Sequence, residues 1–191
     1  DASERSLSVD AVLETHDIAA LFGSYCHYCI EHADGLPASG YPDPRGLPAA
    51  VRPPDRVPAR DRETFYREGA ELARGFLASP IAAGLRGARS VEHEVAFLLN
   101  AGALGQDERV GPDDSGPVRP DARIIRGQID LLAEYDDRVL VIDFKSDRRL
   151  EPDDYRTQMA IYRAAARALT GKPVDVQLFD LRNARAVPIS F

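Results

Sequence analysis

The alternation of apolar and polar positions predicts two neighbouring strands and a helix in the C-terminal half of the chain. Residues 139–142, Val-Leu-Val-Ile, form a short continuous apolar run, which is typical of a strand buried on both faces. Residues 125–132 carry strand-like apolar side chains, and the polar residues 135–138 supply a turn between the two strands. After a polar link, the apolar spacing over residues 155–166 changes to that of a helix.

Further helical and extended segments are predicted on both sides of this region. They are helices over 17–32 and 61–78, strands over 88–99 and 174–181, and a short edge strand over 186–189. We expect Asp17 to cap the first of these helices, and Asp153 or Asp154 to cap the helix that precedes Gly171. Gly171 is a typical residue at the C-terminal end of a helix. The order helix, strand, strand, strand, helix, strand predicts an α/β fold with a mixed sheet.

Two long loops are expected to interrupt these elements. Residues 34–60 and 104–121 are rich in Pro, Gly and Asp, which disfavours regular structure. The chain has 191 residues, 44% of them hydrophobic, so we expect 1–191 to form a single domain with a sizeable core. Because the chain begins at Asp1 without Met, we expect it to be excised from a larger protein.

Composition narrows the location and the partners of the protein. No stretch approaches the length of a membrane span, and no signal peptide is visible. The two cysteines are too few for a disulfide framework, which favours a cytoplasmic location. The net charge of −7 argues against a free-standing DNA-binding protein that relies on a basic surface.

Charged residues stand where the strand pattern predicts burial. Asp130 interrupts an apolar segment, and Asp143 and Lys145 follow the run at 139–142. A buried carboxylate is costly unless something pairs with it, and carboxylates are the ligands that Mg²⁺ prefers. Asp143 and Lys145 are two residues apart, so a strand directs both to one face. The only other lysine is Lys172, which suggests that position 145 requires an ammonium group rather than a guanidinium.

These residues form an ordered set of motifs that resembles a known family. Gly127-x-Ile-Asp130 followed by Ile142-Asp143-x-Lys145 is similar to the motif of the PD-(D/E)XK nucleases. Gln158-x-x-x-Tyr162 resembles the motif of the RecB-like branch, which includes the C-terminal nuclease domains of RecB, AddA and related UvrD/Rep-type helicase-nucleases. The resemblance implies a restriction-endonuclease-like core in which a central mixed sheet is flanked by helices.

The resemblance also implies roles for individual residues at the metal. Asp130, Asp143 and the Phe144 carbonyl would hold Mg²⁺ or Mn²⁺, and Lys145 would orient the attacking water. Gly23-x-x-x-His27 resembles the motif that opens RecB-like nuclease domains, so His27 would be a further ligand. Without the downstream motifs, His27 would be an ordinary helical histidine. His16 and His32 lack such a context, and we expect them to be solvated.

Further residues are implied to line the site. Glu94-x-x-Phe97 is similar to an acidic motif of the family, so Glu94 is a possible additional acid, although Glu92 is nearby. Gln158, Tyr162 and Ser146 would contact DNA. Gln158 and Tyr162 are four residues apart and therefore share one helical face. On a generic helix, the alternative is a core tyrosine beside a surface glutamine.

Cys26 and Cys29 form a C-x-x-C pair around His27. A zinc half-site would need a second ligand pair, and no suitable pair follows. Some relatives hold an iron–sulfur cluster with one cysteine before and three after the nuclease core, but this chain has no cysteine after Cys29. We therefore expect no iron–sulfur cluster and two buried free thiols.

The motifs together predict a Mg²⁺- or Mn²⁺-dependent deoxyribonuclease, with exonuclease action favoured over endonuclease action. The resemblance implies a role in double-strand-break repair and recombination, with DNA, particularly single-stranded ends, as the substrate. The partners would be helicase motor domains on the same chain and a second helicase-nuclease subunit. The alternatives are a catalytically inert nuclease-like docking or DNA-binding module and a purely structural network of ions. The inert module predicts a damaged set of motifs, and the structural network leaves Lys145, Gln158 and Tyr162 unexplained.

Overall fold

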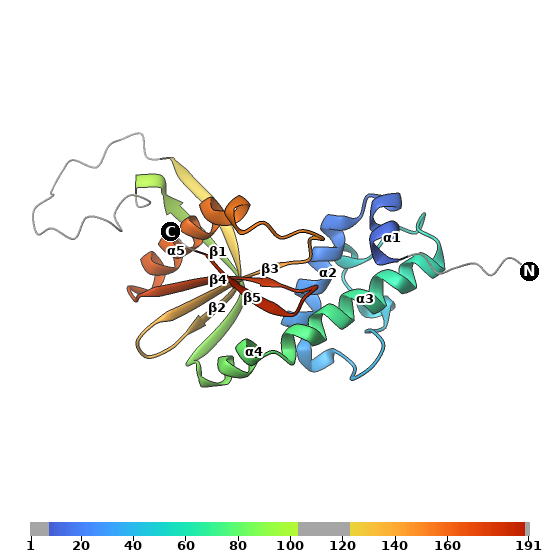
Figure 1. Ribbon diagram of the computed structural model, residues 1–191, viewed down its shortest axis with the longest axis horizontal. Helices are drawn as coiled ribbons and strands as arrows, with labels where there is room; N and C mark the ends of the chain where they lie inside the picture. Colours follow the sequence, from blue (N-terminus) through green and yellow to red (C-terminus); the bar gives the residue numbers. More distant parts are fainter. Residues whose placement is uncertain (1–7, 103–122, 190–191) are drawn as a thin grey trace, which may run out of the picture. The chain divides into compact units, whose positions relative to one another are not determined.

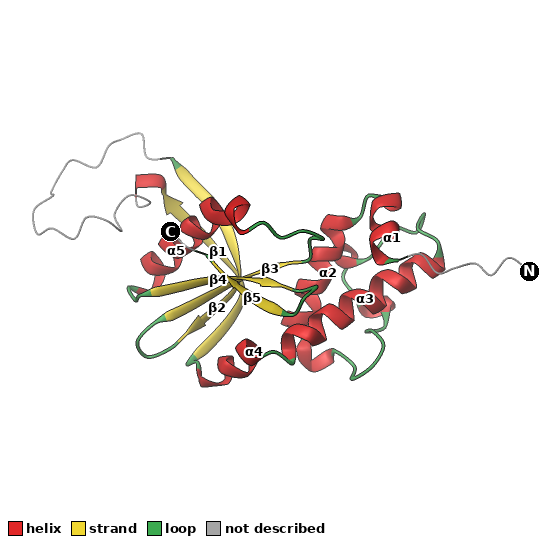
Figure 2. Ribbon diagram, in the orientation of Figure 1, coloured by secondary structure: helices red, strands yellow, loops and turns green. Residues whose placement is uncertain are grey.

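The computed structural model describes residues 8–102 and 123–189. Within these residues the helices are α1 (Val9–His16), α2 (Ala19–Glu31), α3 (Ala59–Leu77), α4 (Pro80–Gly84) and α5 (Arg156–Thr170), as labelled in Figure 1. The strands are β1 (Ser90–Asn100), β2 (Ile124–Glu134), β3 (Val139–Lys145), β4 (Val174–Asp180) and β5 (Arg185–Pro188), drawn as yellow arrows in Figure 2. The fold is α/β, as predicted from the sequence. The predicted loop over 104–121 lies outside the described residues.

The chain divides into two compact units. The helical unit consists of Asp1–Gly84, Phe144–Leu150 and Phe179–Ala186, and the sheet unit consists of Leu85–Asp143, Glu151–Leu178 and Val187–Phe191. One boundary between them falls inside β3, between Asp143 and Phe144. The single domain expected over 1–191 stays a prediction.

An aromatic core holds the helical unit together. In this unit α2 packs against α3, where the Phe65 ring lies 5.3 Å from each of the Phe22 and Tyr25 rings. Gly69 of α3 faces Tyr25, and a Cβ atom at this position would lie 2.6 Å from the Tyr25 ring. Glycine within α3 is therefore required by the close approach of α2, which outweighs its poor helix propensity.

Both cysteines belong to this core. Cys26 and Cys29 are buried free thiols on α2, which confirms the prediction. Burial raises the pKa of both thiols, that of Cys29 to about 11. A thiol with a raised pKa is mostly protonated at neutral pH and is therefore unreactive.

The predicted helix over 17–32 is wrong at its N-terminal end. α1 ends at His16, and Asp17 adopts a left-handed conformation with φ 52°, so that its N–H bonds the last turn of α1. α2 then begins at Ala19 with Ile18 as its N-cap, and the expected cap by Asp17 is not formed. Aspartate tolerates this conformation better than most residues, which makes the break possible.

His16 is not solvated, contrary to the prediction. Its Nε2 atom lies 2.9 Å from the Oδ2 atom of Asp61, and the His16 side chain is 14% exposed. Asp61 on α3 is itself buried, so the two polar groups satisfy each other beneath the surface. The His32 side chain is half exposed, in agreement with the prediction.

Residues 34–60 contain no strand and enter α3 only at Ala59, as expected of a long loop. The segment instead contains short 3₁₀ turns, including Pro44–Gly46 and Ala49–Val51. Leu47, Val51 and Val57 are buried, and they anchor the loop in the helical unit.

The sheet has the strand order β1-β2-β3-β4-β5. β1 pairs antiparallel with β2, and β2 pairs antiparallel with β3. The N–H of Val139 at the start of β3 donates to Pro173, just before β4, and the Lys145 carbonyl at the end of β3 accepts from Leu181, just after β4. β3 and β4 therefore run in the same direction, which makes the sheet mixed. β5 lies at an edge, where Pro188 is tolerated.

The helix α5 connects β3 to β4 and packs against β1. Its apolar face buries Met159, Tyr162, Ala165 and Ala166. The expected cap by Asp153 or Asp154 is wrong, because these residues lie in a 3₁₀ turn over Pro152–Tyr155 and α5 begins at Arg156 without a side-chain cap. Gly171 ends the helix in the left-handed conformation, as predicted. Among the described residues, no helix is both long enough and apolar enough to span a bilayer.

Candidate active site

Two adjacent strands bring Asp130 and Asp143 to the same level of the sheet. The register between β2 and β3 runs from Glu134 paired with Val139 to Leu131 paired with Ile142. The next residue on each strand is Asp130 on β2 and Asp143 on β3. Neighbouring strands are about 4.8 Å apart. The two acids that the sequence predicted are therefore neighbours, and Asp143 is only 1% exposed.

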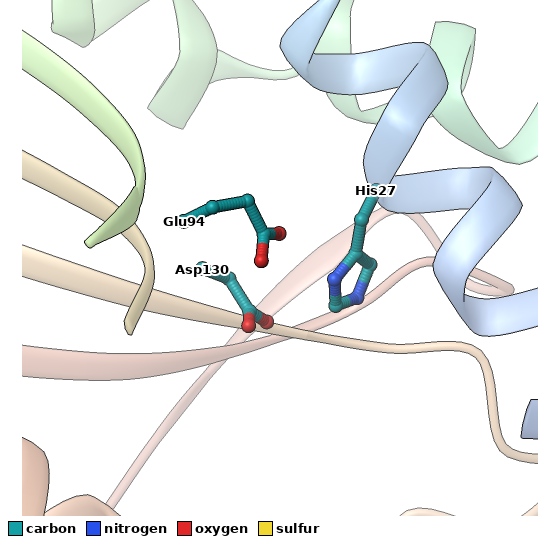
Figure 3. Close-up of side chains that lie close together, drawn as sticks. All are labelled: His27, Glu94 and Asp130. Carbon is teal, nitrogen blue, oxygen red and sulfur yellow. The ribbon is translucent and has the colours of Figure 1, made fainter. Parts of the chain in front are cut away.

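Glu94 joins these acids from the other side of β2. The register between β1 and β2 pairs His93 with Leu131 and Val95 with Ile129, which places Glu94 opposite Asp130. Figure 3 shows the two side chains directed toward each other, and carboxylate oxygens of Glu94 and Asp130 lie within 4.8 Å. The three strands therefore carry an acidic row at one level, and it matches the Glu94, Asp130 and Asp143 predicted from the motifs.

The backbone of Glu94 is strained. Its φ of 53° lies in the left-handed region, although Glu94 stands inside a strand. The Glu94 carbonyl accepts a hydrogen bond of 3.1 Å from the Nε2 atom of Gln128 on β2. A left-handed conformation at a residue other than glycine is costly and occurs frequently at functional sites. The strain therefore gives Glu94 a reason for its position that Glu92, an exposed residue of the same strand, does not have.

Gln158 and Tyr162 of α5 reach the acidic row. The Nε2 atom of Gln158 lies 3.2 Å from the Oδ1 atom of Asp143 and 2.9 Å from the Tyr162 hydroxyl oxygen. Burial raises the pKa of Tyr162 to about 12; the hydrogen bond from Gln158 opposes this, and the negative charges of Asp143, Asp130 and Glu94 add to it. The helical spacing thus brings both residues to the acids, as the sequence indicated.

Gly127 has a packing role beside this site. A Cβ atom at Gly127 would overlap with the ring of Phe97 on β1. The Phe97 ring in turn packs edge-on against Tyr162, with ring centroids 5.8 Å apart. The glycine that opens the Gly127-x-Ile-Asp130 motif therefore makes room for the aromatic ring that supports Tyr162.

In the helical unit, His27 lies beside the backbone of Phe144. The His27 Nε2 atom of α2 is 3.3 Å from the Phe144 carbonyl oxygen, and the two rings pack edge-on at 5.6 Å. Two donor atoms at right angles on an octahedral ion with bonds of about 2.1 Å lie about 3 Å apart. The spacing of these two atoms therefore fits a pair of ligands on one Mg²⁺ or Mn²⁺ ion. Figure 3 labels the His27 side chain.

Lys145 and Ser146 complete the predicted set, and both are partly buried. Lys145 is the last residue of β3, and its carbonyl accepts a hydrogen bond of 2.9 Å from the N–H of Leu181. The Ser146 carbonyl accepts one of 2.6 Å from the Nε atom of Arg182. The backbone after the predicted metal ligands is thus held by residues of the turn that follows β4.

The structure groups the predicted residues within each unit. In the sheet unit, Glu94, Asp130, Asp143, Gln158 and Tyr162 lie together. In the helical unit, His27 lies against Phe144, while Lys145 and Ser146 follow in the chain. The peptide bond between Asp143 and Phe144 joins the two groups.

Sequence reasoning missed Gln128 and Arg182. Gln128 contacts the Glu94 carbonyl from the neighbouring strand, and its place inside the Gly127-x-Ile-Asp130 motif, together with its position opposite β1, was a signal that could have indicated it. Arg182 follows β4 in a turn of no distinctive pattern, and no local signal pointed to it.

The chain belongs to the PD-(D/E)XK nuclease superfamily, because the model of that family matches residues 4–188. The chain is 32% identical over 114 residues to an ATP-dependent helicase/nuclease protein of Desulforamulus reducens. This match covers 57% of the chain and 9% of the relative, so the chain corresponds to a small part of that protein. Among solved structures, protein VC1899 from Vibrio cholerae aligns with a TM-score of 0.37 and 12% identity, over 95% of this chain and 45% of that chain.

Proposed function

We propose that the protein is a metal-dependent deoxyribonuclease that hydrolyses phosphodiester bonds. The observation that carries this proposal is the convergence of Glu94, Asp130 and Asp143 with Gln158 and Tyr162. Carboxylates concentrated at one level of a sheet repel one another unless a cation or a proton neutralises them. Oxygen-rich ligand sets suit Mg²⁺ and Mn²⁺, which are the ions that we propose.

Asp130, Asp143, the Phe144 carbonyl and His27 are the proposed ligands, with Glu94 as an additional acid. His27 is included because its Nε2 atom lies beside the Phe144 carbonyl, one residue after Asp143. When bound, the divalent ion polarises a phosphate oxygen and lowers the pKa of a coordinated water.

The remaining residues position the substrate and the water in this proposal. The Lys145 ammonium donates to the attacking water and offsets the negative charge that develops on the phosphate. Tyr162, with a pKa of about 12, keeps its proton at neutral pH and can donate to a phosphate oxygen. Gln158 and Ser146 offer further donors along the same strand of DNA.

We propose that the nuclease acts on single-stranded DNA ends as an exonuclease, in double-strand-break repair and recombination. The helicase/nuclease name of the relative supports this setting, in which helicase motor domains on the same chain and a second helicase-nuclease subunit would supply the DNA. Such motor domains could also supply the basic track that a chain of net charge −7 lacks. The cytoplasm is the proposed location, which agrees with two free cysteines.

Cleavage of end-labelled DNA tests the proposal. Single- and double-stranded substrates are incubated with wild type or Asp143→Asn in Mg²⁺, Mn²⁺ or EDTA. We expect metal-dependent cleavage that Asp143→Asn removes and that the control Asp175→Asn, at an exposed position of β4, retains. Lys145→Ala should lose cleavage while Mn²⁺ binding, measured by calorimetry, persists.

Two outcomes would contradict the proposal. Equal cleavage by wild type and Asp143→Asn would mean that Asp143 does not hold the metal. Absence of both cleavage and Mn²⁺ binding in wild type would instead support the inert docking module.

A further inference from the structure

Arg182 connects three segments of the helical unit that are distant in the sequence. It lies in the turn after β4, and its Nε–H donates to the Ser146 carbonyl oxygen at 2.6 Å. Its Nη2 atom lies 2.7 Å from the Oδ1 atom of Asp10 on α1, and the two side chains are 19% and 24% exposed. Charge-assisted hydrogen bonds of this kind are stronger and more directional than those between neutral groups.

The turn that carries Arg182 holds two consecutive carbonyl groups. Leu181 donates its N–H to the Lys145 carbonyl, and Arg182 donates to the next carbonyl, that of Ser146. The backbone on which Lys145 stands is therefore bound at both of its first two acceptors after β3. Asp10 holds the other arm of the same guanidinium and so fixes its orientation.

We propose that Arg182, oriented by Asp10, is a positioning residue for Lys145. The inference rests on the proposed function, because it takes Lys145 to be the group that orients the attacking water. A planar guanidinium can bond the carbonyl and the carboxylate at the same time in a fixed geometry, whereas a lysine ammonium is a single point on a flexible stem. Displacement of a catalytic group by about 1 Å can reduce a rate by about a hundredfold.

Arg148 makes a matched comparison possible. It also contacts Asp10, at 3.3 Å, and Glu14, at 2.8 Å, but its side chain is 63% exposed. Because Arg148 stays beside Asp10 when Arg182 is replaced, the carboxylate keeps a cationic partner and the replacement should fold. The contacts described for Arg148 are with acidic side chains of α1, so its substitution controls for the loss of an ion pair with Asp10.

The test compares wild type, Arg182→Lys and the control Arg148→Lys. For each protein we would measure kcat and KM for DNA cleavage, Mn²⁺ affinity by calorimetry, and Tm. We expect Arg182→Lys to lower kcat at least about tenfold while KM and Mn²⁺ affinity stay within about twofold of wild type. Arg148→Lys should leave all of these quantities close to wild type.

Two results would overturn the inference. A kcat of Arg182→Lys within about twofold of wild type would mean that the turn does not position Lys145. Parallel losses in kcat, Mn²⁺ affinity and Tm would show that Arg182 supports the fold in general. A wild-type protein without metal-dependent cleavage would contradict the proposed function, and this inference with it, so the two failures are distinguishable.

Discussion

Gln158 of α5 donates from its Nε2 atom toward Asp143 of β3 at 3.2 Å and toward the Tyr162 hydroxyl at 2.9 Å. One amide thus links a proposed metal ligand to a proposed DNA contact. The link orients the Asp143 carboxylate through the element that follows β3 in the chain. A hydrogen bond to a charged group contributes about 1.5–3 kcal/mol, so loss of this amide should be measurable.

We expect Gln158→Met, which keeps length and removes the donor, to lower kcat/KM by about tenfold or more. Steady-state cleavage assays would measure this. The matched control is Thr157→Ala, an exposed neighbour on the same helix, which should behave like wild type. Equal activity of Gln158→Met and wild type would mean that the amide does not orient Asp143.

Tyr162 should make stability depend on pH in alkaline solution. Its pKa is about 12 in the folded protein and about 10 when unfolded, so the unfolded chain loses this proton first. The stabilising contribution of the neutral phenol is therefore fully present below pH 10 and is lost as pH rises toward 12. Relative to Tyr162→Phe, wild type should lose about 1–2 kcal/mol of unfolding free energy between pH 9 and pH 11.5, measured by urea titration.

The comparison with Tyr162→Phe removes the contribution of other alkaline groups, such as Tyr25, whose pKa is raised by burial. Both proteins contain those groups, so their effect cancels in the difference. A difference between the two proteins that stays constant over this pH range would contradict the raised pKa of Tyr162.

The strain at Glu94 predicts opposite effects on stability and on activity. Glycine adopts a positive φ without penalty, so Glu94→Gly should be more stable than Glu94→Ala by about 1 kcal/mol. Both variants lack the carboxylate beside Asp130, so both should bind Mn²⁺ more weakly and cleave DNA more slowly. Chemical denaturation and calorimetry would measure the two quantities. An alanine variant as stable as the glycine variant would argue against backbone strain at this position.

Gly127→Ala should destabilise the sheet unit, because the added methyl group overlaps with the Phe97 ring. Overpacking of this kind costs about 1–3 kcal/mol, measurable by urea unfolding. Adding Phe97→Leu should restore part of the loss, since the smaller side chain makes room. Gly84→Ala is the control, because a Cβ atom there meets nothing within 4 Å. Equal losses in the two alanine variants would rule out the contact with Phe97.

The sequence was informative where a pattern is local. The apolar run before Asp143 predicts a buried strand, and the four-residue spacing of Gln158 and Tyr162 places both on one face of a helix. The structure agrees in both places, because strand and helix periodicity follow directly from backbone geometry.

Other features depend on contacts that no local pattern records. Arg182 and Asp10 are near opposite ends of the chain, and their ion pair exists only after the segments between them have folded. The break at Asp17 depends on a single left-handed residue, and the same aspartate in an extended conformation would have served as the expected N-cap. The burial of His16 likewise follows from its contact with Asp61 on a helix much later in the chain.

The two thiols of α2 offer an internal probe of native-state fluctuations. Cys26 and Cys29 stand immediately around His27, and both are inaccessible in the folded protein. A disulfide reagent can modify them only when this helix transiently exposes its inner face, so the modification rate in excess reagent reports the opening equilibrium. Repeating the measurement with Mn²⁺ would show how strongly an occupied metal site suppresses the excursions of the helix that carries His27, without any added label or engineered residue.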